Sequence, residues 1–266
     1  MFIKTTKSTF FLTKDRVIEE TPVLFIHGFT GSSKSWSLIR NEINIPSLSL
    51  DIPGHNKSTF NDMNEDYFFK DFSNELYMIL SQLKINKLHI CGYSLGGRLA
   101  IAFASKYPSM IESLVLESTT IGIEDRQQRE ERYIEDIELS SNIKNNLPMF
   151  NKSWEKNKLF ELQKKRNIEG FNEQKDIRQG HNKDQLSKSL KTFSVGNMPF
   201  MRNTFQKFEF PIHIINGKDD IKFIKEGRIM LRLNNHSKQY IVNNASHNVH
   251  LENKEMFTDI FNNIYN

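Results

Sequence analysis

Hydrophobic residues fall into two kinds of pattern along this chain, short continuous runs and stripes with helical spacing. A continuous apolar run at residues 23–26 is typical of a strand that is buried on both faces of a parallel sheet, and the runs at 88–91 and 212–215, each interrupted by one histidine, predict further short strands. Stripes with apolar residues three and four positions apart predict helices over residues 69–83 and 256–264. Because strands and helices alternate, the sequence predicts an α/β fold with a mostly parallel central sheet flanked by helices.

The remaining strands and helices have weaker patterns. Asp66 is placed to cap the helix over residues 69–83. A further helix is expected around Trp36, Leu38, Ile39 and Ile43. Additional strands are expected at residues 2–7, 8–13, 47–50, 114–116 and 240–242.

Residues 121–200 break the alternation of strands and helices. They read as several charged helices with scattered apolar positions, and they contain no convincing strand. We therefore expect a helical cap at residues 121–200, inserted after the strand at about residues 113–118. Residues 1–120 and 201–266 are then expected to form the core.

Composition limits the function without defining it. The 266 residues suit one large domain, and the formal net charge of +4 comes from interspersed charges, so we expect no nucleic-acid partner. The lone cysteine, Cys91, falls in a predicted strand, where a small buried hydrophobe is its expected role. Because the sequence has no apolar leader and no 18-residue apolar window, we expect a cytoplasmic protein without membrane insertion, as a monomer or homodimer.

The clearest chemical signal is Gly-x-Ser-x-Gly at residues 92–96, between a predicted strand and a predicted helix. Gly92 and Gly96 lack a Cβ, so strand and helix approach closely and the turn holds Ser94 exposed as a nucleophile. The Leu95 N–H then lies at a helix N-terminus, where free donors favour an oxyanion. In chains of this plan the second donor is the N–H after the His-Gly pair, which is that of Phe29.

A serine hydroxyl needs a histidine to take its proton and a carboxylate to orient that histidine. Both groups follow later predicted strands, in the order Ser, Asp, His. Asp220 is preferred to Asp219 because of its distance from the preceding turn glycine. His247 is preferred to His250 because it follows a small residue directly beyond the strand. No cluster has the spacing of zinc ligands, so we expect no metal.

These motifs together resemble the α/β-hydrolase superfamily across most of the chain. Within it, residues 92–98, 217–223 and 245–250 are similar to 2-succinyl-6-hydroxy-2,4-cyclohexadiene-1-carboxylate synthase of menaquinone biosynthesis. The resemblance implies a cofactor-independent lyase that eliminates pyruvate from 2-succinyl-5-enolpyruvyl-6-hydroxy-3-cyclohexene-1-carboxylate, with a Ser-His-Asp triad acting in proton abstraction. It also implies that this small polycarboxylate contacts Arg98, Arg132 or Arg129, Arg178, Tyr93 and Trp154.

Two other functions fit the same motifs. The first is a small-molecule carboxylesterase or carbon–carbon bond hydrolase that uses Ser94 as a covalent nucleophile, and the fold alone does not separate it from the lyase. The second is a non-catalytic ligand-binding protein, against which the complete set of Ser94, Asp220 and His247 argues. Arg98 discriminates between lyase and esterase, because a cation one helical turn beyond the nucleophile suits a carboxylated substrate. The alternative for Arg98 is an exposed, solvated helix charge.

Overall fold

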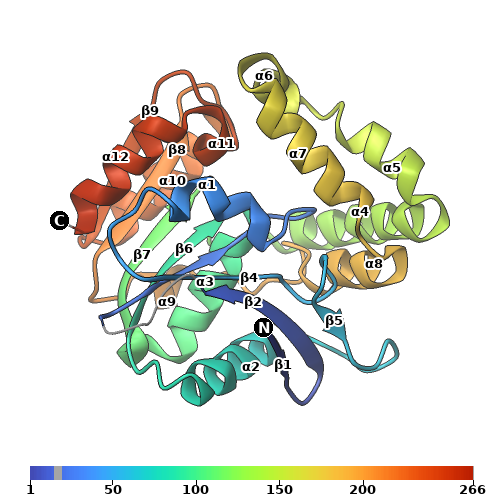
Figure 1. Cartoon of the computed structure of the whole chain (residues 1–266), viewed down its shortest axis with the longest axis horizontal. Helices are drawn as coiled ribbons and strands as arrows, with labels where there is room; N and C mark the ends of the chain where they lie inside the picture. Colours follow the sequence, from blue (N-terminus) through green and yellow to red (C-terminus); the bar gives the residue numbers. More distant parts are fainter. Residues whose placement is uncertain (15–19, 266) are drawn as a thin grey trace.

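A nine-stranded sheet runs through the centre of the molecule (Figure 1). The structure is a computed structural model and describes residues 1–14 and 20–265. The strands lie in the order β1-β2-β4-β3-β6-β7-β8-β9, and β5 pairs with β2. They are β1 (Phe2–Lys4), β2 (Ser8–Lys14), β3 (Val23–Ile26), β4 (Ser47–Leu50), β5 (Thr59–Phe60), β6 (Leu88–Tyr93), β7 (Ile111–Glu117), β8 (Ile212–Gly217) and β9 (Ser237–Val242).

The sheet is mostly parallel, as the continuous apolar runs predicted. All neighbouring pairs from β4 to β9 are parallel. The antiparallel pairs lie at the other end of the sheet, where β2 pairs with β1, β4 and β5. All four residues of β3 are buried, because β3 is a central strand with helices on both faces.

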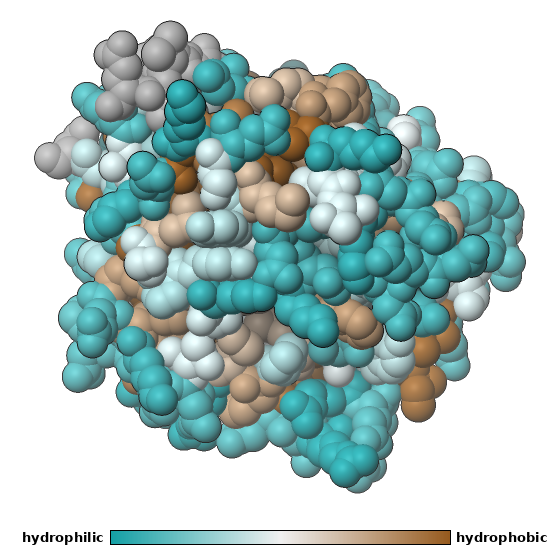
Figure 2. Space-filling model, turned by 90° about the horizontal axis from the view of Figure 1, so that it is seen from below, coloured by the Kyte–Doolittle hydropathy of each residue, from teal (hydrophilic) through white to brown (hydrophobic). Residues whose placement is uncertain are grey.

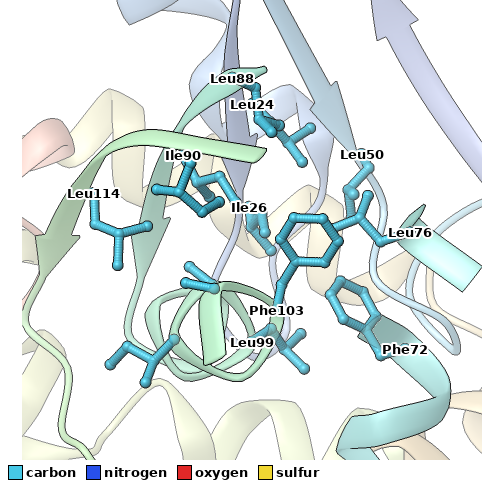
Figure 3. Close-up of a cluster of buried hydrophobic side chains, with 14 of the residues drawn as sticks. Leu24, Ile26, Leu50, Phe72, Leu76, Leu88, Ile90, Leu99, Phe103 and Leu114 are labelled. Atoms are coloured by element: carbon cyan, nitrogen blue, oxygen red, sulfur yellow. The ribbon is translucent and has the colours of Figure 1, made fainter. Parts of the chain in front are cut away.

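Helices cover both faces of the sheet. On one face α2 (Phe69–Gln82) and α3 (Leu95–Lys106) bury Phe72 and Phe103 in a cluster with Ile90 (Figure 3). On the other face Trp36 and α12 (Lys254–Tyr265) pack in a cluster with Cys91, which is fully buried as predicted. The other core helices are η1 (Ser33–Trp36), α1 (Ser37–Arg40), η2 (Pro108–Met110), α9 (Arg202–Phe205), α10 (Ile221–Leu233) and α11 (Val249–Glu252).

Two local expectations were wrong. Asp66 does not cap α2; the Phe68 N–H donates instead to the Asp71 carboxylate at 2.8 Å, from inside the first turn. The helix expected to include Ile43 ends at Arg40. The buried Arg40 guanidinium, at this helix end, donates to Ser47 Oγ at the start of β4 at 3.1 Å.

Residues 121–200, which we call the helical insertion, hold five α-helices and, among the described residues, no strand of the sheet. Figure 1 shows these helices gathered beside the sheet, with α4 and α8 adjacent and α6 and α7 above them. They share a small hydrophobic cluster that includes Ile143, Phe150 and Leu186. The helices are α4 (Arg126–Asn145), α5 (Leu147–Trp154), α6 (Lys158–Arg166), α7 (Ile168–Gln179) and α8 (Lys183–Thr192).

Hydrophilic residues cover most of the face seen in Figure 2, and hydrophobic residues form separate areas on it. Over residues 1–14 and 20–265, every helix falls short of the length and apolarity that a membrane span requires. The cytoplasmic location stays a prediction.

Candidate active site

Ser94 lies in a sharp turn between β6 and α3. Its backbone has φ 51° and ψ −107°, a conformation that costs a non-glycine residue about 1–3 kcal/mol. Close backbone packing enforces the turn, because a Cβ on Gly96 would come within 2.1 Å of the Ile26 carbonyl oxygen. Thr119 Oγ1 also donates to the Ser94 carbonyl at 2.7 Å. This strained strand–turn–helix is the geometry that the Gly-x-Ser-x-Gly motif predicted.

His247 connects the Ser94 hydroxyl to the Asp220 carboxylate. His247 Nε2 lies 3.3 Å from Ser94 Oγ, and His247 Nδ1 lies 2.7 Å from Asp220 Oδ2. His247 and Asp220 are both buried. Asp219 takes a different partner, since its carboxylate pairs with Arg166 at 2.5 Å. The structure therefore brings together the three predicted groups in an arrangement that can pass a proton from Ser94 to His247.

Two backbone N–H groups near Ser94 are free to bind an anion. Those of Phe29 and Leu95 donate to no acceptor in the part of the chain that the structure describes, and both residues line the same cavity as Ser94. Leu95 begins α3, so its N–H is one of the free donors of a helix N-terminus. Such donors stabilise negative charge that develops on a substrate oxygen. Their role as an oxyanion hole stays a prediction.

Buried histidines hold the loop that carries Phe29. His27 Nε2 accepts the Ile52 N–H at 2.9 Å, so its Nδ1–H donates to the Gly28 carbonyl at 2.7 Å. His55 Nε2 accepts the Thr30 N–H at 3.2 Å. Burial lowers the pKa of both histidines, which keeps them neutral and able to accept these bonds. His27 is therefore a structural residue of the loop.

His181 joins the helical insertion to the same loop. Its Nδ1 accepts the Asn56 N–H at 2.9 Å, so its Nε2–H donates to the Thr30 carbonyl at 3.0 Å. Burial lowers the pKa of His181 from 6.5 to about 4. The bridge therefore depends on the neutral imidazole, because a protonated Nδ1 would face the Asn56 N–H donor.

A cavity of about 620 Å³ lies beside Ser94, between the core and the helical insertion. Its volume is in the range of small-molecule sites. Within residues 1–14 and 20–265, no three His, Cys, Asp or Glu side chains are grouped as ligands for a metal ion. The charged residues that line the cavity are Arg98, Arg132, Arg202 and Lys222 with Glu124, Glu131, Glu135, Asp136 and Glu226.

Arg98 and Arg132 lie close together at the wall of this cavity. Arg98 is one helical turn beyond Ser94, and its Nη1 donates to the Phe193 carbonyl at 2.7 Å. Burial, together with the charge of Arg132, lowers the pKa of Arg98 from 12.5 to about 10. Arg132 pairs with Asp136 at 3.0 Å, whereas no ion pair involves Arg98 among the described residues. The wall thus carries two neighbouring cations, of which only Arg132 has a carboxylate partner among the described residues.

The other predicted substrate contacts divide into two groups. Tyr93 and Trp154 line the cavity, whereas Arg129 does not. Of the two candidates Arg132 and Arg129, only Arg132 lies at the cavity wall. The Tyr93 ring lies 5.4 Å from that of His247, and the Trp154 indole packs edge-to-face with Phe29 at 5.6 Å. The structure does not bring Arg129 to the site.

Arg178 also lies outside this cavity. Its guanidinium carbon lies 5.3 and 5.6 Å from the ring centroids of Phe160 and Phe171, and its Nη1 lies 3.7 Å from a Glu155 carboxylate oxygen. Burial lowers the pKa of Arg178. It borders a separate small cleft that also includes Tyr93. Arg178 is therefore not among the residues that line the cavity beside Ser94, and its contact with substrate stays a prediction.

Sequence reasoning missed several charged residues of the cavity, among them Asp136 and Lys222. Asp136 is buried and accepts hydrogen bonds from Arg132 and from Ser194 Oγ at 2.7 Å. The four-residue spacing of Arg132 and Asp136 on a predicted helix was the available signal. Lys222 lines the cavity two residues after Asp220, in the stretch 217–223 that carried the family resemblance.

Comparison with known proteins places this geometry in a family. A family model described as alpha/beta hydrolase fold matches residues 21–254. The 2-succinyl-6-hydroxy-2,4-cyclohexadiene-1-carboxylate synthase of Enterobacter sp. is 28% identical and covers 87% of this chain and 86% of its own. A Bacillus subtilis protein that carries this name provisionally is 32% identical, over 90% of this chain and 88% of its own. This chain belongs to that synthase family.

A solved structure of a synthase-family protein, MenH from S. aureus, has the same fold. Its TM-score with this chain is 0.88 at 26% identity, and the match covers 97% of each chain. The predicted α/β-hydrolase fold and the predicted family are therefore confirmed. The roles of individual residues stay predictions.

Proposed function

We propose that this chain eliminates pyruvate from 2-succinyl-5-enolpyruvyl-6-hydroxy-3-cyclohexene-1-carboxylate, which forms 2-succinyl-6-hydroxy-2,4-cyclohexadiene-1-carboxylate in menaquinone biosynthesis. The product is the compound that names the synthase relatives. The observation that carries the proposal is Arg98, a partly buried cation that lines the cavity one helical turn from Ser94. No ion pair satisfies this cation among the described residues, so a substrate carboxylate is its natural partner.

In this proposal Ser94 acts as a base. Its Oγ accepts a proton from a ring carbon while its own hydroxyl proton passes to His247 Nε2, 3.3 Å away. The electrons of the C2–H bond form the C2–C3 double bond, the existing C3–C4 double bond moves to C4–C5, and the bond from C5 to the enolpyruvyl oxygen breaks. The leaving enolate of pyruvate then takes a proton from His247. Asp220, 2.7 Å from His247 Nδ1, stabilises the intervening imidazolium.

Negative charge that develops on a substrate oxygen is stabilised by the Phe29 and Leu95 N–H groups. The Leu95 N–H is held by the start of α3, and the Phe29 N–H lies in the loop that follows β3. The histidine bonds of His27 and His55 hold this loop. The same two donors suit a hydrolase intermediate, so they do not distinguish the lyase from an esterase.

Arg98 and Arg132 are proposed to bind the carboxylates. A guanidinium presents two parallel N–H groups to a carboxylate and stays charged at any working pH. The pKa of Arg98, lowered to about 10, still leaves it charged near pH 7. Tyr93 and Trp154, which also line the cavity, are proposed to contact the apolar parts of the substrate.

The helical insertion is proposed to act as a cap over a core of residues 1–120 and 201–266. Two observations support this division: the insertion has its own hydrophobic cluster, and it supplies Arg132 and Trp154 to the cavity. Arg178 and Arg129 lie outside the cavity, so either would need a movement of the cap to reach the substrate. The proposed partner is thus a small polycarboxylate, and the proposed location is the cytoplasm.

Pyruvate release tests this proposal. Purified protein is incubated with the enolpyruvyl substrate, and pyruvate is followed with lactate dehydrogenase and NADH. In parallel, the protein is incubated with a short-chain aryl ester, and Ser94→Ala is the control in both assays. The proposal expects Ser94-dependent pyruvate release that greatly exceeds ester cleavage. Rapid Ser94-dependent ester cleavage without pyruvate release would favour the hydrolase instead.

A further inference from the structure

The two loops that carry Asp220 and His247 lie against each other. The Asp219 N–H donates to the Ala245 carbonyl at 3.1 Å. A Cβ on Gly217 would come within 2.1 Å of the Ser246 carbonyl oxygen, so no side chain fits between the loops. A displacement of either loop therefore changes the alignment of His247 with Asp220.

Glu252, at the end of α11, holds the loop that carries His247, which we call the histidine loop. One of its carboxylate oxygens accepts the Ser246 hydroxyl at 2.5 Å and the Asn248 N–H at 3.3 Å. The other accepts the Ser246 N–H at 3.0 Å. These bonds hold Ser246 and Asn248, the residues on either side of His247, in place. The Glu252 side chain is fully buried, so its charge needs a cationic partner inside the protein.

That partner comes from the helical insertion. Arg166, the last residue of α6, donates from Nη1 to Glu252 at 2.9 Å and from Nη2 to Asp219 at 2.5 Å. One guanidinium thus bridges the histidine loop and the loop that carries Asp219 and Asp220. The next residue, Asn167, adds a hydrogen bond to the Leu251 carbonyl at 2.7 Å. The insertion therefore contacts both the loop that carries His247 and the loop that carries Asp220.

We propose that Arg166 is a positioning residue that aligns His247 and Asp220 through Glu252 and Asp219. Arg166 does not line the cavity, so it acts on the triad rather than on the substrate. Because Arg166 belongs to the helical insertion, the position of the insertion affects how well His247 and Asp220 are aligned. The expected effect on turnover rests on the proposed function, whereas the expected effect on the loops does not.

Removal of Arg166 leaves a buried, uncompensated carboxylate at Glu252. The simplest relief is for Glu252 to turn toward water, and this movement releases Ser246 and Asn248 and loosens His247. Proton transfer then slows, whereas the cavity wall around Arg98 and Arg132 is unchanged. A positioning role therefore predicts a fall in kcat at nearly constant KM.

The test uses Arg166→Gln, with Lys165→Gln as a matched control from the same helix. Lys165 pairs with Glu161 at 2.9 Å on the exposed side of α6. We expect Arg166→Gln to lower kcat for pyruvate release by about tenfold or more with KM within about threefold, and Lys165→Gln to leave both unchanged. Arg166→Lys should recover part of the loss, because an ammonium restores the charge but bridges two carboxylates poorly.

A second variant separates charge compensation from loss of packing. In Arg166→Gln combined with Glu252→Gln, the uncompensated charge is gone, and the amide oxygen still accepts from Ser246. We expect the double variant to have a kcat at least about threefold above that of Arg166→Gln alone. A kcat of Arg166→Gln equal to that of wild type, or an equal loss in Lys165→Gln, would overturn the proposal.

Amide hydrogen exchange tests the same proposal without substrate. We expect residues 245–249 to exchange about tenfold faster in Arg166→Gln than in wild type, and at the wild-type rate in Lys165→Gln. Unchanged exchange in Arg166→Gln would show that Arg166 does not hold the loop. If wild-type protein released no pyruvate, the proposed function would fail, but this exchange result would still decide the role of Arg166.

Discussion

Replacement of Arg98 by methionine should separate the cost of this residue in folding from its use in binding. Arg98 is partly buried, and its guanidinium donates to the Phe193 carbonyl at 2.7 Å. Its neighbour Arg132 repels it and lowers its pKa, whereas the charge of Asp136 has the smaller, opposite effect. Methionine keeps most of the length of the side chain and removes the charge, so little packing is lost.

The magnitude follows from the pKa of Arg98. Its fall from 12.5 to about 10 means that the charged form is favoured less in the folded than in the unfolded chain, by about 3 kcal/mol. The hydrogen bond to Phe193 offsets about 1.5–3 kcal/mol of this cost. Arg98→Met removes both contributions, so the free energy of unfolding should change by about 0 to +1.5 kcal/mol. The melting temperature is then unchanged or a few degrees higher.

Activity should respond in the opposite direction. A buried carboxylate of the substrate that loses its charged partner costs about 2–5 kcal/mol of binding. This range corresponds to a fall in kcat/KM of about 30-fold to several thousandfold. The assay is pyruvate release together with thermal unfolding, with Arg126→Met as a control, since Arg126 is an exposed arginine paired with Glu130. Near-normal kcat/KM in Arg98→Met, or a melting temperature lower by more than about 10 °C, would refute the reasoning.

Three further outcomes follow from the structure. Ser94→Ala should retain the fold but lower kcat by several orders of magnitude; more than about a tenth of wild-type kcat would mean that Ser94 is not the base. Burial lowers the pKa of His181 to about 4. Between about pH 6.5 and 4 the unfolded chain therefore binds a proton on His181 and the folded chain does not. The free energy of unfolding thus falls as the pH is lowered through this range. His181 should account for about 3 kcal/mol of that loss. In urea unfolding, the free energy of unfolding of His181→Gln should therefore change less with pH than that of wild type. An equal change in both proteins would contradict a buried, neutral His181. Gly96→Ala should reduce soluble folded protein, because its Cβ would meet the Ile26 carbonyl at 2.1 Å; a wild-type melting temperature would contradict the described turn.

Local sequence patterns predicted the parts of the site that depend on neighbours in the chain. The run at residues 23–26 matches β3 residue for residue, because a strand buried on both faces tolerates only apolar side chains. The elbow at Ser94 was predictable for a similar reason, since two glycines and a helix start lie within five residues of it. Asp220 and His247 followed from their positions after predicted strands, and the structure brings both to Ser94.

Contacts between distant segments were not predictable in this way. Arg178 has the residue type that a carboxylate site needs, yet the packing of α7 places it over Phe160 and Phe171 rather than in the cavity. His181 bonds to Asn56, which is 125 residues away in the chain, so no local pattern signals its burial. Arg166 reads as a charge at a helix end, and only the approach of α6 to the triad loops gives it two carboxylate partners.

The fate of solvent oxygen tests the central claim, that Ser94 acts as a base in an elimination. The enolpyruvyl substrate is converted in H₂¹⁸O, and all products are analysed by mass spectrometry. An elimination gives pyruvate and the cyclohexadiene, which is lighter than the substrate by one pyruvic acid and keeps its succinyl group without ¹⁸O. Release of succinate that carries one ¹⁸O atom, together with a succinyl adduct on Ser94 during turnover, would mean that Ser94 is a nucleophile and that the chain is a hydrolase.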